Sequence, residues 1–95
     1  MEYIPKDTIA LAFIKKEPMT GSYEGMRYKL SKKGEAIEVC IWPEPYNFHT
    51  TKEELKQYKE FELSPEGKDD AVDWLNEQID VQAGLWENAR NAHWA

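Results

Sequence analysis

Residues 26–42, MRYKLSKKGEAIEVCIW, decide the fold, because two runs of alternating apolar and polar residues lie on either side of Gly34. Side chains alternate between the two faces of a strand, so each run predicts a strand with one buried face. A two-residue turn at Lys33-Gly34 joins the strands in a register that satisfies both faces of the hairpin. In this register the pairs are Met26 with Ile41, Tyr28 with Val39, Leu30 with Ile37 and, on the outer face, Lys29 with Glu38.

The segments on both sides of the hairpin extend the prediction to a small sheet covered by helices. Pro43 and Pro45 end the second strand, because proline cannot donate a hydrogen bond within a central strand. Phe61 and Leu63 alternate with acidic residues and predict a third, short strand. Residues 5–16 suit either a strand or a short helix, and we favour the helix.

A long C-terminal helix is predicted from Ser64 to about residue 91. Ser64 suits the N-cap and Pro65 the first helical position, and no proline follows. One apolar stripe repeats at helical spacing and would face the sheet, namely Val72, Leu75, Ile79, Ala83 and Trp86. The chain therefore predicts a single α+β domain over residues 1–95, in which a long helix packs on one face of a three-stranded antiparallel meander in the order α-β-β-β-α.

Acidic residues lie along one flank of the predicted helix. The chain carries 12 basic and 18 acidic residues, and almost all of the net charge of −6 lies after residue 63. Acids in the first helical turn complement the helix dipole, but acids further along repel one another. The flank is therefore either a solvated surface or a docking surface for a basic protein. Its members are Glu66, Asp69, Asp70, Asp73, Glu77, Asp80 and Glu87.

A second apolar stripe lies almost opposite the first and comprises Trp74, Val81 and Leu85. A helix that lies on a sheet needs only one apolar side, so these side chains need a cover. The apolar residues between positions 9 and 14 are one candidate cover. The alternatives are a protein partner and self-association of the chain as a homodimer.

The loop after the hairpin is rich in aromatic residues. Trp42, Tyr46 and Phe48 are interspersed with two prolines that stiffen the chain, so docking would cost little entropy. These residue types are enriched at the centres of protein interfaces. They either form a docking surface or close one end of the core.

No catalytic or metal-binding constellation is evident in the sequence. Cys40 is the single cysteine, and the spacing of Cys40, His49 and His93 is not that of a zinc site. Adjacent acids diverge on a helix, and the chain has no glycine loop for phosphate. We therefore expect no cofactor, no metal and no enzymatic activity.

The sequence also predicts where the protein resides. No apolar run approaches the roughly 20 residues that span a bilayer. The first residues lack the basic start and apolar stretch of a signal peptide, and a lone cysteine allows no internal disulfide. We expect a cytoplasmic protein without membrane contact.

Single-stranded nucleic-acid binding is the alternative function. Arg27, Lys29 and the pair Lys32-Lys33 share the hairpin with nearby aromatic residues, a combination typical of surfaces that bind single strands. The order α-β-β-β-α also occurs in double-stranded RNA-binding domains, but these place basic residues where this helix begins with acids. We therefore favour a protein partner over nucleic acid.

Three blocks of the chain are distinctive, namely residues 21–28 (GSYEGMRY), 41–46 (IWPEPY) and 71–78 (AVDWLNEQ). In these blocks the chain resembles a family of small proteins from gut Firmicutes, often carried on integrative or conjugative elements and plasmids, and the resemblance covers roughly residues 8–86. The family has no assigned activity, so the resemblance implies only a context. Small acidic accessory proteins of mobile elements include antagonists of host defence, anti-CRISPR proteins among them.

These observations predict a non-enzymatic protein-binding module. The acidic flank, the second apolar stripe and the stiff aromatic loop each indicate a surface for a protein, and a basic surface is the best match for the flank. A small acidic inhibitor or adaptor of a mobile element is the form that the resemblance suggests.

Overall fold

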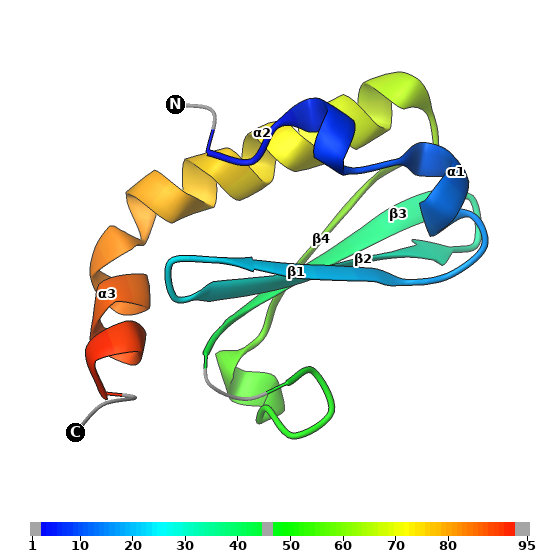
Figure 1. The fold of residues 1–95 in the computed structure, drawn as a ribbon. Coiled ribbons are helices and arrows are strands. Elements are labelled where there is room, and N and C mark those ends of the chain that lie inside the picture. Colours follow the sequence, from blue (N-terminus) through cyan, green and yellow to red (C-terminus); the bar gives the residue numbers. More distant parts are fainter. Residues whose placement is uncertain (1–2, 45–46, 93–95) are drawn as a thin grey trace.

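In a computed structural model that describes residues 3–44 and 47–92, the protein is an α+β fold with one four-stranded antiparallel sheet (Figure 1). The strands are β1 (Met19–Tyr23), β2 (Met26–Lys33), β3 (Ala36–Pro43) and β4 (Gln57–Glu62), paired in that order. The helices are α1 (Leu11–Ile14), α2 (Pro65–Val81) and α3 (Ala83–Ala92), with 3₁₀ turns at η1 (Lys6–Thr8) and η2 (Glu53–Leu55). α2 lies across one face of the sheet and α3 lies at the sheet's end, beside the turn between β1 and β2 (Figure 1).

The strand β1 is the one that the sequence analysis missed, so the predicted three-stranded sheet is wrong by one strand. β1 is only five residues long and has Gly21 at its centre, a residue type that is depleted in strands. It pairs with β2 through a two-residue turn at Glu24-Gly25, whose φ angles are 44° and 99°. Positive φ at both central residues is the signature of the type I′ hairpin turn.

The hairpin of β2 and β3 is confirmed, but its register differs by two residues from the predicted one. The turn is Gly34-Glu35, and Gly34 supplies a φ of 63° at the first central position. Because the shift is even, every side chain keeps its predicted face. None of the four predicted pairs forms, and the observed pairs are Met26 with Pro43, Tyr28 with Ile41, Leu30 with Val39, Lys29 with Cys40 and Ser31 with Glu38.

The C-terminal helix begins as predicted but is not continuous. The hydroxyl of Ser64 accepts a hydrogen bond from the backbone N–H of Gly67 at 3.0 Å, and a proline occupies the first position. The predicted single helix is wrong, because Gln82 leaves helical geometry with φ −113° and ψ 28°. The side-chain amides of Gln82 and Gln57 exchange two hydrogen bonds of 2.9 and 3.0 Å, which fix the break to the start of β4.

Trp86 holds α3 close to the end of α2. Its side chain is buried, and its indole N–H donates to the backbone oxygen of Gln78 at 2.9 Å. Of the predicted core stripe, Val72, Leu75, Ile79 and Trp86 are buried. Ala83 is exposed, because the break at Gln82 changes the helix direction at that point.

The N-terminal segment completes the core beside α2. The helix predicted over residues 5–16 is reduced to the 3₁₀ turn η1 and the four residues of α1. Ile4, Ile9 and Ile14 nevertheless join the same core as the inner faces of β2 and β3. Figure 1 shows this segment running alongside α2 before it reaches β1.

Asn76 fixes the N-terminal segment to α2. Its side-chain oxygen accepts hydrogen bonds from the backbone N–H groups of Tyr3 and Ile4, at 2.9 and 2.7 Å. Its amide nitrogen donates to the backbone oxygen of Ile4 at 3.1 Å. Asn76 is buried, and its two bonds to Ile4 satisfy buried polar groups, while its bond to Tyr3 is partly buried.

Candidate functional site

Six of the seven predicted acidic residues lie on α2, on one side of a continuous helix. Glu87 lies apart from them on α3, beyond the break at Gln82. Asp69 is half-buried and the other five are exposed. We call these six residues the acidic flank: Glu66, Asp69, Asp70, Asp73, Glu77 and Asp80.

The N-terminal segment contacts part of the acidic flank. The hydroxyl of Tyr3 donates to the carboxylate of Asp80 at 2.5 Å, and this hydrogen bond raises the pKa of Tyr3. The ammonium group of Lys6 lies 3.5 Å from the carboxylate of Asp73. Lys68, on α2, donates to the backbone oxygen of Lys6 at 2.8 Å. One edge of the flank therefore helps to hold the segment in place.

The rest of the acidic flank has little intrachain compensation. Asp69 pairs with its neighbour Lys68 at 3.0 Å. Within residues 3–44 and 47–92, Glu66, Asp70 and Glu77 take part in no ion pair. Their carboxylates face solvent, which is the condition that a docking surface for a basic partner requires.

The second apolar stripe is divided by the break in the helix. Trp74 is half-buried, and its ring packs against that of Phe61 on β4 with a centroid separation of 6.2 Å. Val81 and Leu85 remain exposed, with 69% and 40% of their surface accessible. β4 covers Trp74, whereas the N-terminal segment that could have covered it runs along the acidic flank.

The predicted aromatic loop is partly folded onto the outer face of the sheet, the face opposite α2. Trp42 is 3% exposed, and the half-buried ring of Phe48 meets it edge-on at 5.6 Å between centroids. Tyr46 lies outside the described residues. The burial of Trp42 leaves almost none of its surface for a partner, so Trp42 closes this end of the sheet.

Two lysines contact the ring of Phe48. The ammonium groups of Lys29 and Lys56 lie 3.8 and 3.9 Å from its centroid, which is within the range of cation–π attraction. Lys56 also pairs with Glu53 at 2.9 Å. The sequence analysis did not select Lys56 or Glu53, because no local pattern shows that η2 returns the chain to the outer face.

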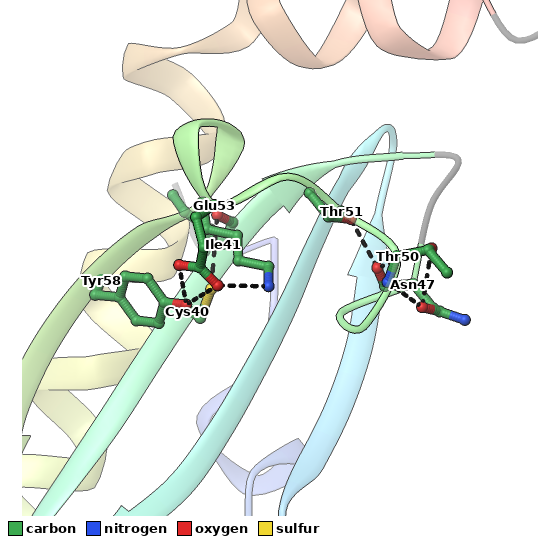
Figure 2. A network of polar contacts seen from close by, with 8 residues as sticks. Cys40, Ile41, Asn47, Thr50, Thr51, Glu53 and Tyr58 are labelled. Atoms are coloured by element: carbon green, nitrogen blue, oxygen red, sulfur yellow. Dashed lines mark hydrogen bonds and ion pairs between the residues drawn. The ribbon is translucent and has the colours of Figure 1, made fainter.

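Figure 2 shows the polar network around Cys40. Cys40 is 2% exposed, and burial raises the pKa of its thiol to about 11. The hydroxyl of Tyr58 donates to Glu53 at 3.0 Å, and burial together with this bond raises the pKa of Tyr58. Hydrogen bonds from Lys56 and Tyr58 lower the pKa of Glu53. The thiol is therefore protonated at neutral pH, which makes Cys40 a poor nucleophile.

Figure 2 also shows the polar contacts of Asn47, Thr50 and Thr51, in the turn that carries Phe48. The side-chain oxygen of Asn47 accepts from the backbone N–H and the hydroxyl of Thr50, at 2.9 and 3.0 Å. The hydroxyl of the buried Thr51 donates to the backbone oxygen of Asn47 at 2.7 Å. These bonds fix the turn that carries Phe48, and His49 packs against the ring of Phe48 at 5.7 Å between centroids.

In the part of the chain that the structure describes, no group of three His, Cys, Asp or Glu side chains could hold a metal ion. The same residues include no helix with the length and apolar character that crossing a bilayer requires.

No protein-family model, curated protein or solved structure matches this chain. The resemblance to the small proteins of gut Firmicutes therefore stays a prediction, and the function has to be inferred from the chain's own residues.

Proposed function

We propose that the protein is a non-enzymatic protein-binding module that holds a partner with a basic surface on the acidic flank of α2. The observation that carries this proposal is the row of exposed carboxylates on one helix, of which Glu66, Asp70 and Glu77 form no ion pair within the described residues. A surface of one sign of charge attracts an oppositely charged partner and orients it on approach. Val81 follows the flank directly and adds exposed apolar area beside it.

Helix stability alone is a weaker explanation for the acidic flank. Glu66 lies in the first turn of α2, where a carboxylate complements the helix dipole. Glu77 does not share this benefit, because it lies four residues after Asp73 and three residues before Asp80. Like charges at these spacings destabilise a helix. The repulsion between these carboxylates does not benefit the fold, and this supports a role for them in binding.

The charge neutralisation Glu77→Gln should stabilise the protein by about 0.5 kcal/mol, because it removes two repulsive contacts. Urea denaturation at low ionic strength measures this gain, which should shrink in about 1 M salt as the Debye length falls to about 3 Å. As a control, Glu35→Gln in the β2–β3 turn should leave the stability unchanged within about 0.5 kcal/mol. A loss of stability in Glu77→Gln would show that this carboxylate serves the fold.

The double variant Asp70→Lys/Glu77→Lys should lose the partner. It reverses two exposed charges of the flank and leaves intact the acids that contact Tyr3 and Lys6. The experiment is affinity capture from host extract over a salt series, with circular dichroism to confirm the fold. A genuine partner binds the wild type at low salt and elutes as salt rises.

The matched control for this capture is Glu35→Lys/Glu54→Lys. It changes the net charge by the same amount at two exposed positions outside α2. The partner should bind this control as it binds the wild type. If the flank variant retains every protein that the wild type captures, the flank is only solvated and the proposal fails.

The resemblance to proteins of mobile elements narrows the class of partner that we propose. A host-defence protein that normally holds nucleic-acid phosphates presents a basic surface, and an acidic helix can occupy such a surface in their place. On this proposal the protein is a small acidic inhibitor or adaptor, comparable in strategy to an anti-CRISPR protein.

A further inference from the structure

A cavity of about 210 Å³ lies on the outer face of the sheet, between β1, β2 and the turn that carries Phe48. Its polar lining consists of Thr20, Ser22, Arg27 and Asn47, and its aromatic lining of Trp42 and Phe48. None of the described residues that line it is acidic. The cavity faces away from α2, so it is independent of the acidic flank.

Arg27 lines this cavity and carries a buried donor that has no acceptor within the described residues. It lies opposite Ser22 on β1 and Trp42 on β3. Its Nε is buried, and no atom of the described residues accepts a hydrogen bond from it. Buried polar groups almost always have a partner, and an unpaired donor on a charged group is especially unfavourable. An anion with several oxygen atoms in the cavity would give the guanidinium of Arg27 an acceptor.

The lysines around Phe48 add positive charge near the cavity, because Phe48 lines it and Lys29 pairs with Thr20, another lining residue, across β1 and β2. Glu53 balances Lys56 at 2.9 Å. Within residues 3–44 and 47–92, no carboxylate pairs with Lys29 or with Arg27. The local charge is therefore positive, although the chain as a whole carries −6.

The same lysines argue against a stacked base as the ligand. The ammonium groups of Lys29 and Lys56 both lie over the ring of Phe48, at 3.8 and 3.9 Å from its centroid. Trp42 is buried. Stacking on free aromatic faces is what holds single strands on other proteins, and these lysines occupy positions over Phe48 that a stacked base would need. The volume also lies below the roughly 300–1,000 Å³ of pockets for drug-sized molecules.

We propose that this cavity binds the phosphate group of a phosphomonoester or a phosphodiester. The guanidinium of Arg27 is planar and can donate two parallel hydrogen bonds to phosphate oxygens. The hydroxyls of Thr20 and Ser22 can donate to the same group. Lys29, which lies over the ring of the lining residue Phe48, supplies a second positive charge nearby. This site uses phosphate chemistry in place of the base stacking that the hairpin sequence first suggested.

Titration of ¹⁵N-labelled protein tests the proposal at the Nε–H signal of Arg27 and the backbone amide of Ser22. Sodium phosphate should shift both signals in a saturable way, and sodium chloride of equal ionic strength should not. In Arg27→Gln the affinity reported by Ser22 should fall by on the order of tenfold or more. Lys32→Gln removes an exposed lysine of the same strand outside the cavity and should leave the affinity unchanged.

An oligothymidylate without terminal phosphates identifies the source of the phosphate group. Tighter binding of this strand than of inorganic phosphate assigns the site to a phosphodiester, whereas binding of phosphate alone assigns it to a phosphomonoester. Equal, unsaturated shifts in phosphate and chloride would overturn the proposal, as would unchanged affinity in Arg27→Gln. If Arg27→Gln does not fold, Arg27→Lys replaces it, since lysine keeps the charge but lacks the forked donor. Wild-type affinity in that variant would overturn the proposal, and weaker binding would support it.

Discussion

Replacing Asn76 by alanine should lower the free energy of unfolding by about 3 kcal/mol. The side chain bonds the backbone of Tyr3 once and that of Ile4 twice, at distances between 2.7 and 3.1 Å. Alanine leaves these groups without a partner in a buried place, and each such loss costs about 1–3 kcal/mol. The sum is reduced because the segment can shift toward water. Chemical denaturation followed by tryptophan fluorescence measures the change.

The control for this variant is Asn88→Ala, at an exposed position of α3. It should change the stability by no more than about 0.5 kcal/mol. Hydrogen exchange adds a local measurement, because the amide of Ile4 should lose protection in Asn76→Ala before the sheet does. If both asparagine variants have the same stability, the three bonds contribute nothing net and our account of the N-terminal segment is wrong.

Replacing Gly25 by alanine should cost a similar amount, about 3 kcal/mol. Gly25 has a φ of 99°, where an L side chain is strained. A Cβ at this position would also collide with the backbone oxygen of Trp86. The turn or α3 must then move, although the ion pair of Glu24 with Arg90 at 2.6 Å holds the two together. The midpoint of thermal unfolding should fall accordingly.

Gly34→Ala separates the two causes. Gly34 also has positive φ, at 63°, but a Cβ there would meet no atom within 4 Å. This variant should therefore cost only the backbone strain, about 1 kcal/mol. Equal losses in the two variants would mean that α3 yields to the new methyl group at no cost, against our expectation.

The elements that the sequence predicts correctly are those with a strong local signal. Strict alternation over residues 26–42 indicates β2 and β3, because a period of two has one structural interpretation. The Ser64-Pro65 pair marks the start of α2 because both residues suit the first helical turn. The apolar spacing of Val72, Leu75 and Ile79 then gives the face that is buried.

The elements that the sequence does not predict depend on distant contacts. The helix breaks at Gln82, which is neither proline nor glycine, and the side chain of Gln82 there bonds Gln57 on β4, a contact between distant positions. The spacing of Trp86 also fits the apolar stripe of an unbroken helix, so it does not indicate the break at Gln82. β1 was missed because it is short and has Gly21, a residue type depleted in strands, at its centre. The two-residue turn at Glu24-Gly25 was the available signal for it.

Of the candidate sites too, the sequence predicts the part that depends on local spacing and does not predict the part that depends on distant contacts. The acidic flank follows from spacing on one helix, so the sequence is sufficient to locate it. Its contacts with Tyr3 and Lys6 are not predictable, because they join positions more than 60 residues apart. The phosphate cavity combines β1, β2 and the turn at Asn47, and only the folded sheet brings these together. Asn76 is a polar residue at the edge of an apolar helix face, and this position could have indicated a buried hydrogen-bonding contact.

The contact between Ile4 and Asn76 spans 72 positions of the chain. Closing so long a loop costs chain entropy before any contact rewards it, whereas the two hairpins close within a few residues. The N-terminal segment should therefore dock late, onto a helix that is already seated on the sheet. During synthesis on the ribosome, residues 3–9 lack their native binding site until Asn76 has emerged.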